Sequence, residues 1–259
     1  MPTIEPTRDQ ILRFCALDPV ERVFLEDVAR RGHGRFAGLP GDDGELRALC
    51  HLGTNVVPSG SGCAAFAGLA AKVRPRMLIG EAGAVGELWD AARRRLGQAR
   101  EDRPGQPVYA ISERPEPGAT GLRAASAADL DLLVPACAAA HELELGVDPL
   151  RRDPSGFRWR TRAQIEERRS WLWEEDGTIL FKAEASAWTP SAVQLQQVWA
   201  DPAARRQGFG GRALRDLIRL LLDAVPTVCL FVRTDNAPAI GLYDAVGMRR
   251  VLDYRSVLL

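Results

Sequence analysis

The sequence predicts a two-lobed protein of the α/β class, in which each lobe is a sheet flanked by helices. Two observations support this prediction. Helical and strand-like periodicities alternate along the chain, and the order of elements before a proline-rich break repeats after it. The break is Arg114-Pro-Glu-Pro-Gly-Ala-Thr120, whose prolines and glycine disfavour both helix and central strand. We therefore expect an N-terminal domain at 1–113, a linker at 114–120 and a C-terminal domain at 121–259.

The first lobe is expected to begin with helices over its first forty residues. Beyond these, apolar runs predict strands at 36–39, 46–57, 77–79 and 108–112, and helical spacing predicts helices at 64–73 and 84–96. In the second lobe we expect strands at 122–125, 178–187, 192–200, 228–232 and 249–259, with helices at 127–145, 161–174, 210–224 and 238–246. The helix at 210–224 has the clearest apolar stripe, formed by Leu214, Leu217, Ile218 and Leu221.

Composition and charge exclude several classes of function. The chain carries 34 basic and 34 acidic side chains, so no net charge attracts nucleic acid or an anionic membrane surface. No uninterrupted apolar stretch is long enough to span a bilayer, and the first residues lack a signal-peptide pattern. The five cysteines form no C-x-x-C pair and the three histidines show no metal-ligand spacing. We expect a cytoplasmic monomer or homodimer with no metal, nucleic-acid or membrane partner.

The segment from Ala200 to Arg212, ADPAARRQGFGGR, is the strongest candidate for a binding site. It leads from an expected strand into an expected helix, and a helix start presents unpaired N–H groups and the positive end of the dipole. Its glycines let the backbone approach a bulky anion, so the turn favours a phosphate. A glycine-rich cap that binds nothing is one alternative. A dinucleotide fingerprint is another, because Gly208-x-Gly210-x-x-Ala213 matches its spacing. Residues 201–207 separate these glycines from the strand, however, and little chain follows, which disfavours the dinucleotide fold.

Two motifs in this half resemble those of GNAT-superfamily N-acetyltransferases. Pro202-x-x-Arg205-x-x-Gly208-x-Gly210 resembles their R/Q-x-x-G-x-G/A signature. Asn236-x-x-Ala239-x-x-Leu242-Tyr243-x-x-x-Gly247-Met248 resembles N-x-x-A-x-x-L-Y-x-x-x-G-F, and only Met248 departs from it. The resemblance covers about residues 121–259. Phe181-Lys-Ala-Glu184, Val198-Trp199 and Arg47–Pro58 further resemble a narrower group, mainly from high-GC bacteria, in which a GNAT domain follows an N-terminal domain of unknown function.

This resemblance implies an acetyl-CoA site and a role for each matching residue. Backbone groups of Val198, Trp199 and Ala200 would pair with the pantetheine arm of acetyl-CoA like an added strand. Amides from Arg206 to Gly211 would hold the pyrophosphate, with Arg205 or Arg212 near the phosphates. The turn that carries these groups comprises Arg205, Arg206, Gln207, Gly208, Phe209, Gly210, Gly211 and Arg212. Asn236 would contact the coenzyme, and Tyr243 would protonate the leaving thiolate.

Each of the proposed catalytic residues also has an interpretation without catalysis. Tyr243 fits a core aromatic whose hydroxyl caps a backbone group, and Asn236 fits a helix N-cap. Glu184, on an expected central strand, is the first candidate for the general base, and its alternative is an ordinary salt bridge. Glu142 and Glu144 are weaker candidates for the base, and His141 is expected to be a solvated helix residue. Five tryptophans cluster in the second lobe. The sequence leaves two roles open for them, which are packing in the core and lining a pocket.

The resemblance implies an N-acyltransferase that moves an acetyl group from acetyl-CoA to an amine of a small molecule or protein. A non-catalytic acyl-CoA sensor or scaffold with the same fold is the alternative. Tyr243 favours the enzyme, because a sensor needs no proton donor. In the first lobe, Pro58-Ser-Gly-Ser-Gly62 lacks the arginine signature and the later helix carries Trp89 but no tyrosine. Our hypothesis is that this lobe is a degenerate GNAT-like unit that has lost coenzyme binding and shapes the acceptor cleft.

Overall fold

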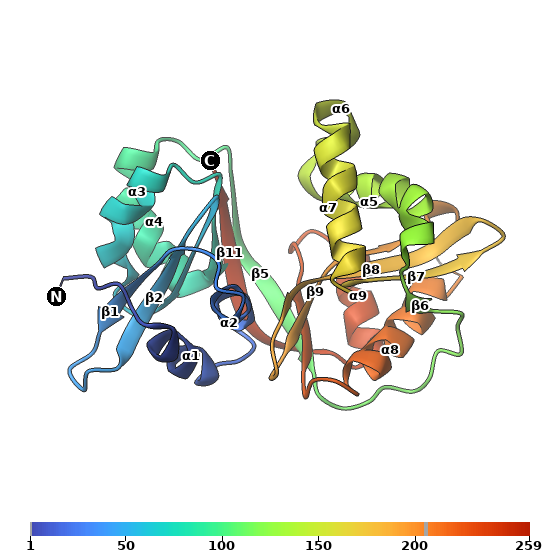
Figure 1. Ribbon diagram of the computed structural model, residues 1–259, viewed down its shortest axis with the longest axis horizontal. Coiled ribbons are helices and arrows are strands. Elements are labelled where there is room, and N and C mark those ends of the chain that lie inside the picture. The colour runs from blue at the N-terminus through green and yellow to red at the C-terminus, as the bar shows by residue number, and fades with distance from the viewer. Residues whose placement is uncertain (1, 205–206) are drawn as a thin grey trace.

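The computed structural model describes residues 2–204 and 207–259, and one sheet of eleven strands runs through both of its lobes (Figure 1). The strand order is β1-β2-β3-β4-β11-β5-β10-β9-β8-β7-β6. Helices cover both faces of the sheet in each lobe. The predicted α/β class with two lobes and a mixed central sheet is confirmed.

The first lobe supplies five strands and four α-helices. The strands are β1 (Phe36–Pro40), β2 (Leu46–Leu52), β3 (Asn55–Gly60), β4 (Met77–Glu81) and β5 (Glu101–Ile111). Helices α1 (Arg8–Ala16) and α2 (Val23–Arg30) pack on one face, and α3 (Ala67–Val73) and α4 (Ala82–Leu96) pack on the other. The strand predicted at 46–57 is in fact the hairpin β2–β3, whose arms pair in antiparallel register.

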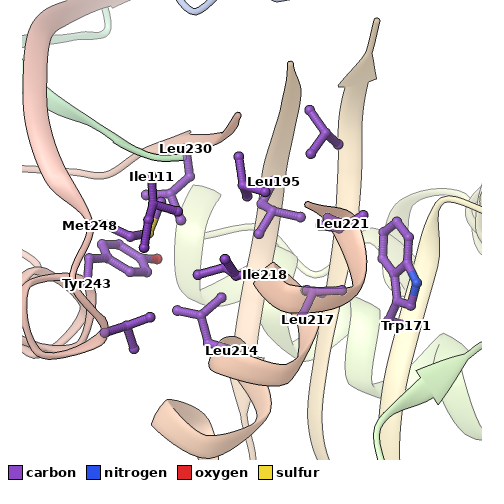
Figure 2. Packing of buried hydrophobic residues seen from close by; sticks show 14 of the residues in the cluster. Ile111, Trp171, Leu195, Leu214, Leu217, Ile218, Leu221, Leu230, Tyr243 and Met248 are labelled. Atoms are coloured by element: carbon purple, nitrogen blue, oxygen red, sulfur yellow. The ribbon is translucent and has the colours of Figure 1, made fainter. Parts of the chain in front are cut away.

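The second lobe contains the remaining strands, β6 (Arg123–Ala124), β7 (Ser170–Glu175), β8 (Thr178–Trp188), β9 (Val193–Ala200), β10 (Val228–Phe231) and β11 (Arg249–Leu258). One face is covered by α5 (Leu130–Leu145), α6 (Pro149–Arg152) and α7 (Pro154–Glu166), the other by α8 (Phe209–Leu221) and α9 (Ala237–Val246). Figure 2 shows the predicted stripe of α8 buried against the sheet, with Leu214, Leu217, Ile218 and Leu221 all inaccessible to solvent.

The helix predicted at 161–174 is wrong in its second half. Helix α7 begins earlier, at Pro154, where Asp153 caps it by accepting a hydrogen bond from the Gly156 amide at 2.9 Å. The chain then leaves the helix at Arg168, which has a left-handed φ of 57°. Trp171 therefore lies in strand β7 and packs in the core beneath α8, while Leu172 faces the α5 side. The short spacing of bulky apolar residues in this segment fits the period of a helix and that of a strand, and pairing with a neighbouring strand makes it a strand.

The two lobes exchange their last strands. β5, the last strand of the first lobe, lies between β10 and β11, and it is antiparallel to both. β11, the last strand of the second lobe, lies between β4 and β5. Each lobe therefore completes its sheet with a strand from the other, and β5 and β11 lie side by side at the centre of Figure 1.

Side chains of helix α2 reinforce this junction on one face of the sheet. Helix α2 packs Val23 against Ala187, Ala192 and Cys229 of the second lobe. Its Asp27 accepts hydrogen bonds from the Arg169 guanidinium at 2.7 and 3.2 Å, and both side chains are buried. A bidentate arginine–carboxylate pair of this kind holds its two elements at a defined angle.

The segment predicted as a linker, 114–120, contains neither helix nor strand and lies along α8. Asp216 accepts hydrogen bonds from the amides of Gly118 and Thr120 at 2.7 and 2.9 Å. Arg212 donates to the carbonyl oxygens of Gly118 and Ala119 at 2.8 and 2.6 Å. The linker is thus held by the same helix whose start is the candidate phosphate site.

No helix in the described part of the chain is long and apolar enough to cross a membrane.

The exchange of strands predicts that the second lobe depends on the first for its folding. Residues 121–259 expressed alone lack β5, which leaves the facing edges of β10 and β11 without their ladder partner. We expect this fragment to lack a cooperative thermal transition in circular dichroism or to aggregate on size-exclusion chromatography. Co-expression of residues 1–120 as a separate chain is the control, and it should restore both. A monomeric fragment that melts as cooperatively as the whole chain would contradict the prediction.

Candidate functional site

The candidate site lies where strands β9 and β10 separate. They pair in parallel only at Val193–Val228 and Gln194–Cys229. β9 then continues to Ala200 while β10 ends at Phe231, with no further ladder pair between them. A parallel pair that opens in this way leaves a wedge between two strands, in which an extended ligand can lie alongside the backbone. Val198, Trp199 and Ala200 all lie in this diverging half of β9.

A β-bulge on β9 lies in the same stretch. Lys182 and Glu184 on β8 face Trp199 and Gln196 on β9, so Ala183 opposes two residues instead of one. Gln197, one of those two, has a φ of 48°. A non-glycine residue in this region stores strain of roughly 1–3 kcal/mol and persists only where its surroundings hold it.

The start of α8 lies beside the end of β9: a Cβ on Gly210 would lie 3.7 Å from the Ala200 side chain. Gly208 is the N-cap with a φ of 82°, a conformation that glycine adopts at no cost and other residues rarely do. The first hydrogen bond of the helix runs from the Arg212 amide to the Gly208 carbonyl. No described residue accepts a hydrogen bond from the amides of Phe209, Gly210 or Gly211. Three donors and the positive end of the dipole therefore converge where the sequence predicts a phosphate.

Several side chains of this turn are placed differently from the prediction or fall outside the described residues. Arg205 and Arg206 lie outside them. The guanidinium of Arg212 is held by the linker carbonyls and lies over the Trp173 ring, so its charge is directed to the linker. Gln207 donates from its side chain to the Ala203 carbonyl at 3.2 Å. The described turn therefore offers backbone amides rather than side-chain charge.

Helix α9 brings Tyr243 to this site. Its neighbour Leu242 packs against the first turn of α8: a Cβ on Gly211 would lie 3.4 Å from the Leu242 side chain. The Tyr243 side chain is 6% exposed and packs in the core beside Ile111 and Met248 (Figure 2). Its ring centroid lies 5.7 Å from that of Tyr109.

No hydrogen bond joins the Tyr243 hydroxyl to any group in residues 2–204 and 207–259, although the residue as a whole is buried. The alternative in which this hydroxyl caps a backbone group is therefore not what the structure shows. Burial, and secondarily the negative charge of Glu144, raise the pKa of Tyr243 well above its ordinary value. A tyrosine in this environment keeps its proton and has it available to donate.

Asn236 is the N-cap of α9, as its helix-capping interpretation predicts. Its side-chain oxygen accepts a hydrogen bond from the Ala239 amide at 3.2 Å, and Pro238 follows within the first turn. This cap fixes where α9 begins and hence where Tyr243 lies, seven residues further on. A contact between Asn236 and a coenzyme stays a prediction.

The candidates for the general base lie on two elements. Glu184 is 7% exposed and its carboxylate accepts from Lys182 Nζ at 2.8 Å and from Cys137 Sγ at 3.2 Å. This geometry is that of the salt-bridge interpretation. Glu142 and Glu144 are exposed at the C-terminal end of α5, and the Glu144 carbonyl accepts a hydrogen bond from Arg233 at 3.5 Å. His141 is half-buried against Phe157 rather than fully solvated, and burial lowers its pKa.

The tryptophans divide between the two roles left open by the sequence. Trp171 and Trp173 are core residues, and Trp188 stacks on Trp171 with ring centroids 6.0 Å apart. Trp199 is half-buried, and its buried indole Nε1 has no partner among the described residues. Trp159 is 71% exposed on α7. No three described His, Cys, Asp or Glu side chains are grouped so that they could hold a metal ion.

Residues 138–248 match the family described as the acetyltransferase (GNAT) family, and residues 34–133 match a family described as a domain of unknown function, DUF4081. Residues 138–248 are a GNAT-family domain. The family predicted from the two motifs is confirmed, as is the preceding domain of unknown function.

Two curated relatives match parts of the chain. N-alpha-acetyltransferase RimI of Mycobacterium tuberculosis is 40% identical over 62 residues, or 24% of this chain and 38% of that protein. Mycothiol acetyltransferase of Brachybacterium faecium is 32% identical over 101 residues, or 34% of this chain and 30% of that protein. The chain therefore covers less than two fifths of the length of either relative.

Solved structures resemble the whole chain. A GNAT-family acetyltransferase from Colwellia psychrerythraea has a TM-score of 0.58 with 10% identity and full coverage of both chains. A Drosophila protein has a TM-score of 0.65 with 12% identity, and covers 99% of this chain and 98% of its own. A tandem GNAT protein from the clavulanic acid biosynthesis pathway has a TM-score of 0.53 with 12% identity and the same coverages. These likenesses show the fold of both lobes, including the GNAT-like fold of the first.

The first lobe repeats the geometry of the GNAT domain but fills the corresponding site with its own groups. β3 and β4 also pair in parallel at only two positions before β3 continues. There, however, Gly80 brings β4 so close that a Cβ would lie 2.9 Å from the Pro58 carbonyl oxygen. The Cys63 amide, at the start of the following helical segment, donates to Glu87 at 2.6 Å. The Glu87 carboxylate thus lies where a bound phosphate would lie, and its negative charge would repel a phosphate.

This comparison of the two lobes predicts one coenzyme A molecule per chain. Isothermal titration with coenzyme A should give a stoichiometry near one. Glu87→Gln is the matched control, because its amide oxygen still accepts from Cys63 and Gly80 still closes the wedge; its stoichiometry should not change. A second binding event in either protein would show that the first lobe has kept a site.

Proposed function

We propose that the chain is an acetyl-CoA-dependent N-acetyltransferase in which the β9–α8 region binds the coenzyme and Tyr243 is the general acid. The observation that supports this most directly is the convergence of three features of the GNAT domain. These are the wedge between β9 and β10, the three amides at the start of α8 and the hydroxyl of Tyr243, and neither the amides nor the hydroxyl has a partner among the described residues. The GNAT family uses acetyl-CoA, and both curated relatives are named acetyltransferases.

The residues present fit such a coenzyme. The amides of Phe209, Gly210 and Gly211 would donate to the pyrophosphate, and β9 offers its backbone at Val198 and Trp199 to the amide groups of a pantetheine arm. Gly208, Gly210 and Gly211 leave room for this approach: a Cβ on Gly208 would meet nothing within 4 Å. When bound, acetyl-CoA supplies the activated acyl group as a thioester.

Tyr243 supplies the proton that the reaction needs. Its hydroxyl would deliver that proton to the sulfur of the leaving thiolate, a step that contributes about 10²–10⁴-fold to the rate in comparable sites. The raised pKa of this hydroxyl suits the role, because the acid stays protonated at neutral pH. Glu144, whose charge contributes to that raised pKa, lies on the exposed side of the site. We propose that the acceptor amine, of a small molecule or a protein, approaches from this side, because a carboxylate there attracts an ammonium group.

The alternative is a non-catalytic sensor or scaffold that binds an acyl-CoA. Coenzyme binding alone does not distinguish the two functions, whereas Tyr243 does. A sensor needs no proton donor, whereas an enzyme can use the Tyr243 hydroxyl as one. We further propose a cytoplasmic protein that acts as a monomer or homodimer.

Binding of acetyl-CoA should stabilise the protein measurably. A ligand at about 100 times its Kd stabilises the native state by about 2.7 kcal/mol. We expect the melting temperature in a thermal-shift assay to rise with acetyl-CoA concentration and to rise also with coenzyme A. Adenosine, which lacks the pyrophosphate and pantetheine, is the control ligand and should give little shift. No shift at millimolar acetyl-CoA would rule out the proposed coenzyme site.

Replacing Tyr243 by phenylalanine should separate catalysis from binding. We expect Tyr243→Phe to lower kcat by roughly 10²-fold, the range of a general acid, while the Kd for coenzyme A changes little. Thiol release from acetyl-CoA against a broad panel of amines measures the first quantity and titration calorimetry the second. Tyr109→Phe is the matched control, because its ring packs beside Tyr243. Equal rates in the Tyr243→Phe and wild-type proteins, or no turnover in either, would favour the sensor.

The pH dependence of the reaction follows from the same pKa. Because the pKa of Tyr243 is raised, the hydroxyl stays protonated beyond the ordinary tyrosine value of about 10. The rate with a given amine should therefore show no alkaline limb below about pH 10. A fall in kcat between pH 7 and 9 that disappears in Tyr243→Phe would mean that this tyrosine ionises in the working range.

A further inference from the structure

Lys182 is one of two lysines among the 34 basic residues of the chain, and its side chain is fully buried. Three acceptors surround its ammonium group: Glu184 Oε1 at 2.8 Å, Gln197 Oε1 at 2.9 Å and Cys137 Sγ at 3.2 Å. An ammonium has three donors on one compact atom, which matches this arrangement as the planar fork of an arginine would not. We call Lys182, Glu184, Cys137, Gln196 and Gln197 the bulge network.

The carboxylate at the centre of this network is fully engaged. Oε1 of Glu184 accepts from Lys182 and from the Cys137 thiol, and Oε2 accepts from Gln196 Nε2 at 3.4 Å. Burial alone raises the pKa of Glu184, but the charge and hydrogen bond of Lys182 outweigh it and leave that pKa lowered. The pKa of Lys182 is raised because the Glu184 charge and its hydrogen bonds outweigh burial. Both groups are thus charged, and Glu184 is a weaker proton acceptor than a free glutamate.

Gln196 and Gln197 both reach this pair, although they are adjacent on one strand. Neighbouring residues on a regular strand point to opposite faces of a sheet. The bulge, with Gln197 at a φ of 48°, turns both side chains to the face that carries Lys182 and Glu184. One glutamine contacts each charged group, so the pair holds the bulge from both of its ends.

We propose that Lys182 and Glu184 are positioning residues that clamp Gln197 and thereby hold the coenzyme-binding half of β9 away from β10. This inference rests on the proposed function of the site. Val198, Trp199 and Ala200 follow Gln197 directly, so the backbone direction at Gln197 sets the direction of this segment. The clamp offsets the strain of a positive φ at a residue other than glycine. Glu184 then acts through Gln197 and the bulge, not as the base.

The clamp predicts how variants at three positions should behave. Lys182→Met with Glu184→Gln removes both charges at nearly constant volume, and it leaves the half-buried Gln197 without its donor. We expect the Kd for coenzyme A to rise roughly tenfold, the size of effect that the strain of one residue at positive φ can produce. Adding Gln197→Gly should restore the Kd, because glycine adopts this φ without a clamp. Adding Gln196→Gly is the matched control and should not restore it.

The thermal transition of the double variant reports whether it folds. A series of single substitutions at Gln197 tests the same clamp if it does not. Gln197→Met removes the acceptor and should weaken coenzyme binding as the double variant does. Gln197→Glu keeps an acceptor for Lys182, and Gln197→Gly removes the strain, so both should keep the wild-type Kd within about twofold. Loss of affinity in Gln197→Gly as large as in Gln197→Met would mean that this side chain touches the coenzyme directly, and would overturn the clamp.

Turnover distinguishes a positioning role of Glu184 from a role as the general base. If the pair acts through the bulge, the variant Lys182→Met/Glu184→Gln/Gln197→Gly regains kcat together with coenzyme affinity. Recovery of affinity with kcat still reduced would identify Glu184 as the base and refute the positioning role. An unchanged Kd in Lys182→Met/Glu184→Gln would refute the clamp while the coenzyme site stands. Absence of coenzyme binding in the wild-type protein would instead refute the proposed function and the clamp with it.

Discussion

The exchange of β5 and β11 is the constraint on which the rest of the structure depends. Each strand completes the sheet of the other lobe, so neither sheet has its full set of ladder partners until both are formed. The buried Asp27–Arg169 pair and the packing of α2 on the second lobe add side-chain contacts to this backbone pairing. β5 also runs beside β10, and Tyr109 on β5 packs against Tyr243. The first lobe therefore supports the site even though its own wedge is closed.

The site itself is built from departures from regular structure. β9 diverges from β10 after two pairs, Gln197 holds a positive φ, and α8 begins on a glycine with no side-chain cap. Each of these leaves backbone groups available that a regular element would have used internally. Around them the structure is closely bonded. The bulge network lies on one side of β9, and the linker fastened to Arg212 and Asp216 lies along the outer face of α8. Irregular backbone at a site of this kind depends on such surroundings for its geometry.

Local patterns in the sequence predicted much of this, and non-local contacts account for what they missed. The α8 stripe, the Asn236 cap and the position of Tyr243 after it depend on residues within a few turns of each other. The helix predicted through Trp171 was wrong, because its apolar spacing suits a strand equally and only pairing with β8 decides the matter. Glu184 was expected either as a base or in a salt bridge, and its partner Lys182 lies only two residues away, on the same strand. Its other partners, Cys137 and Gln196, come from elsewhere in the chain. The bulge and the exchange of strands have no signature within a single segment, since each depends on how strands far apart in sequence pair.

The central claim is that the β9–α8 region of the second lobe binds acetyl-CoA. Hydrogen–deuterium exchange with and without acetyl-CoA tests it most directly, because it reports on the backbone amides that are assigned to the coenzyme. The account predicts slower exchange in peptides covering residues 197–213, with little change in those covering residues 57–70 of the first lobe. Protection at residues 57–70, or no protection at residues 197–213 under saturating acetyl-CoA, would contradict it.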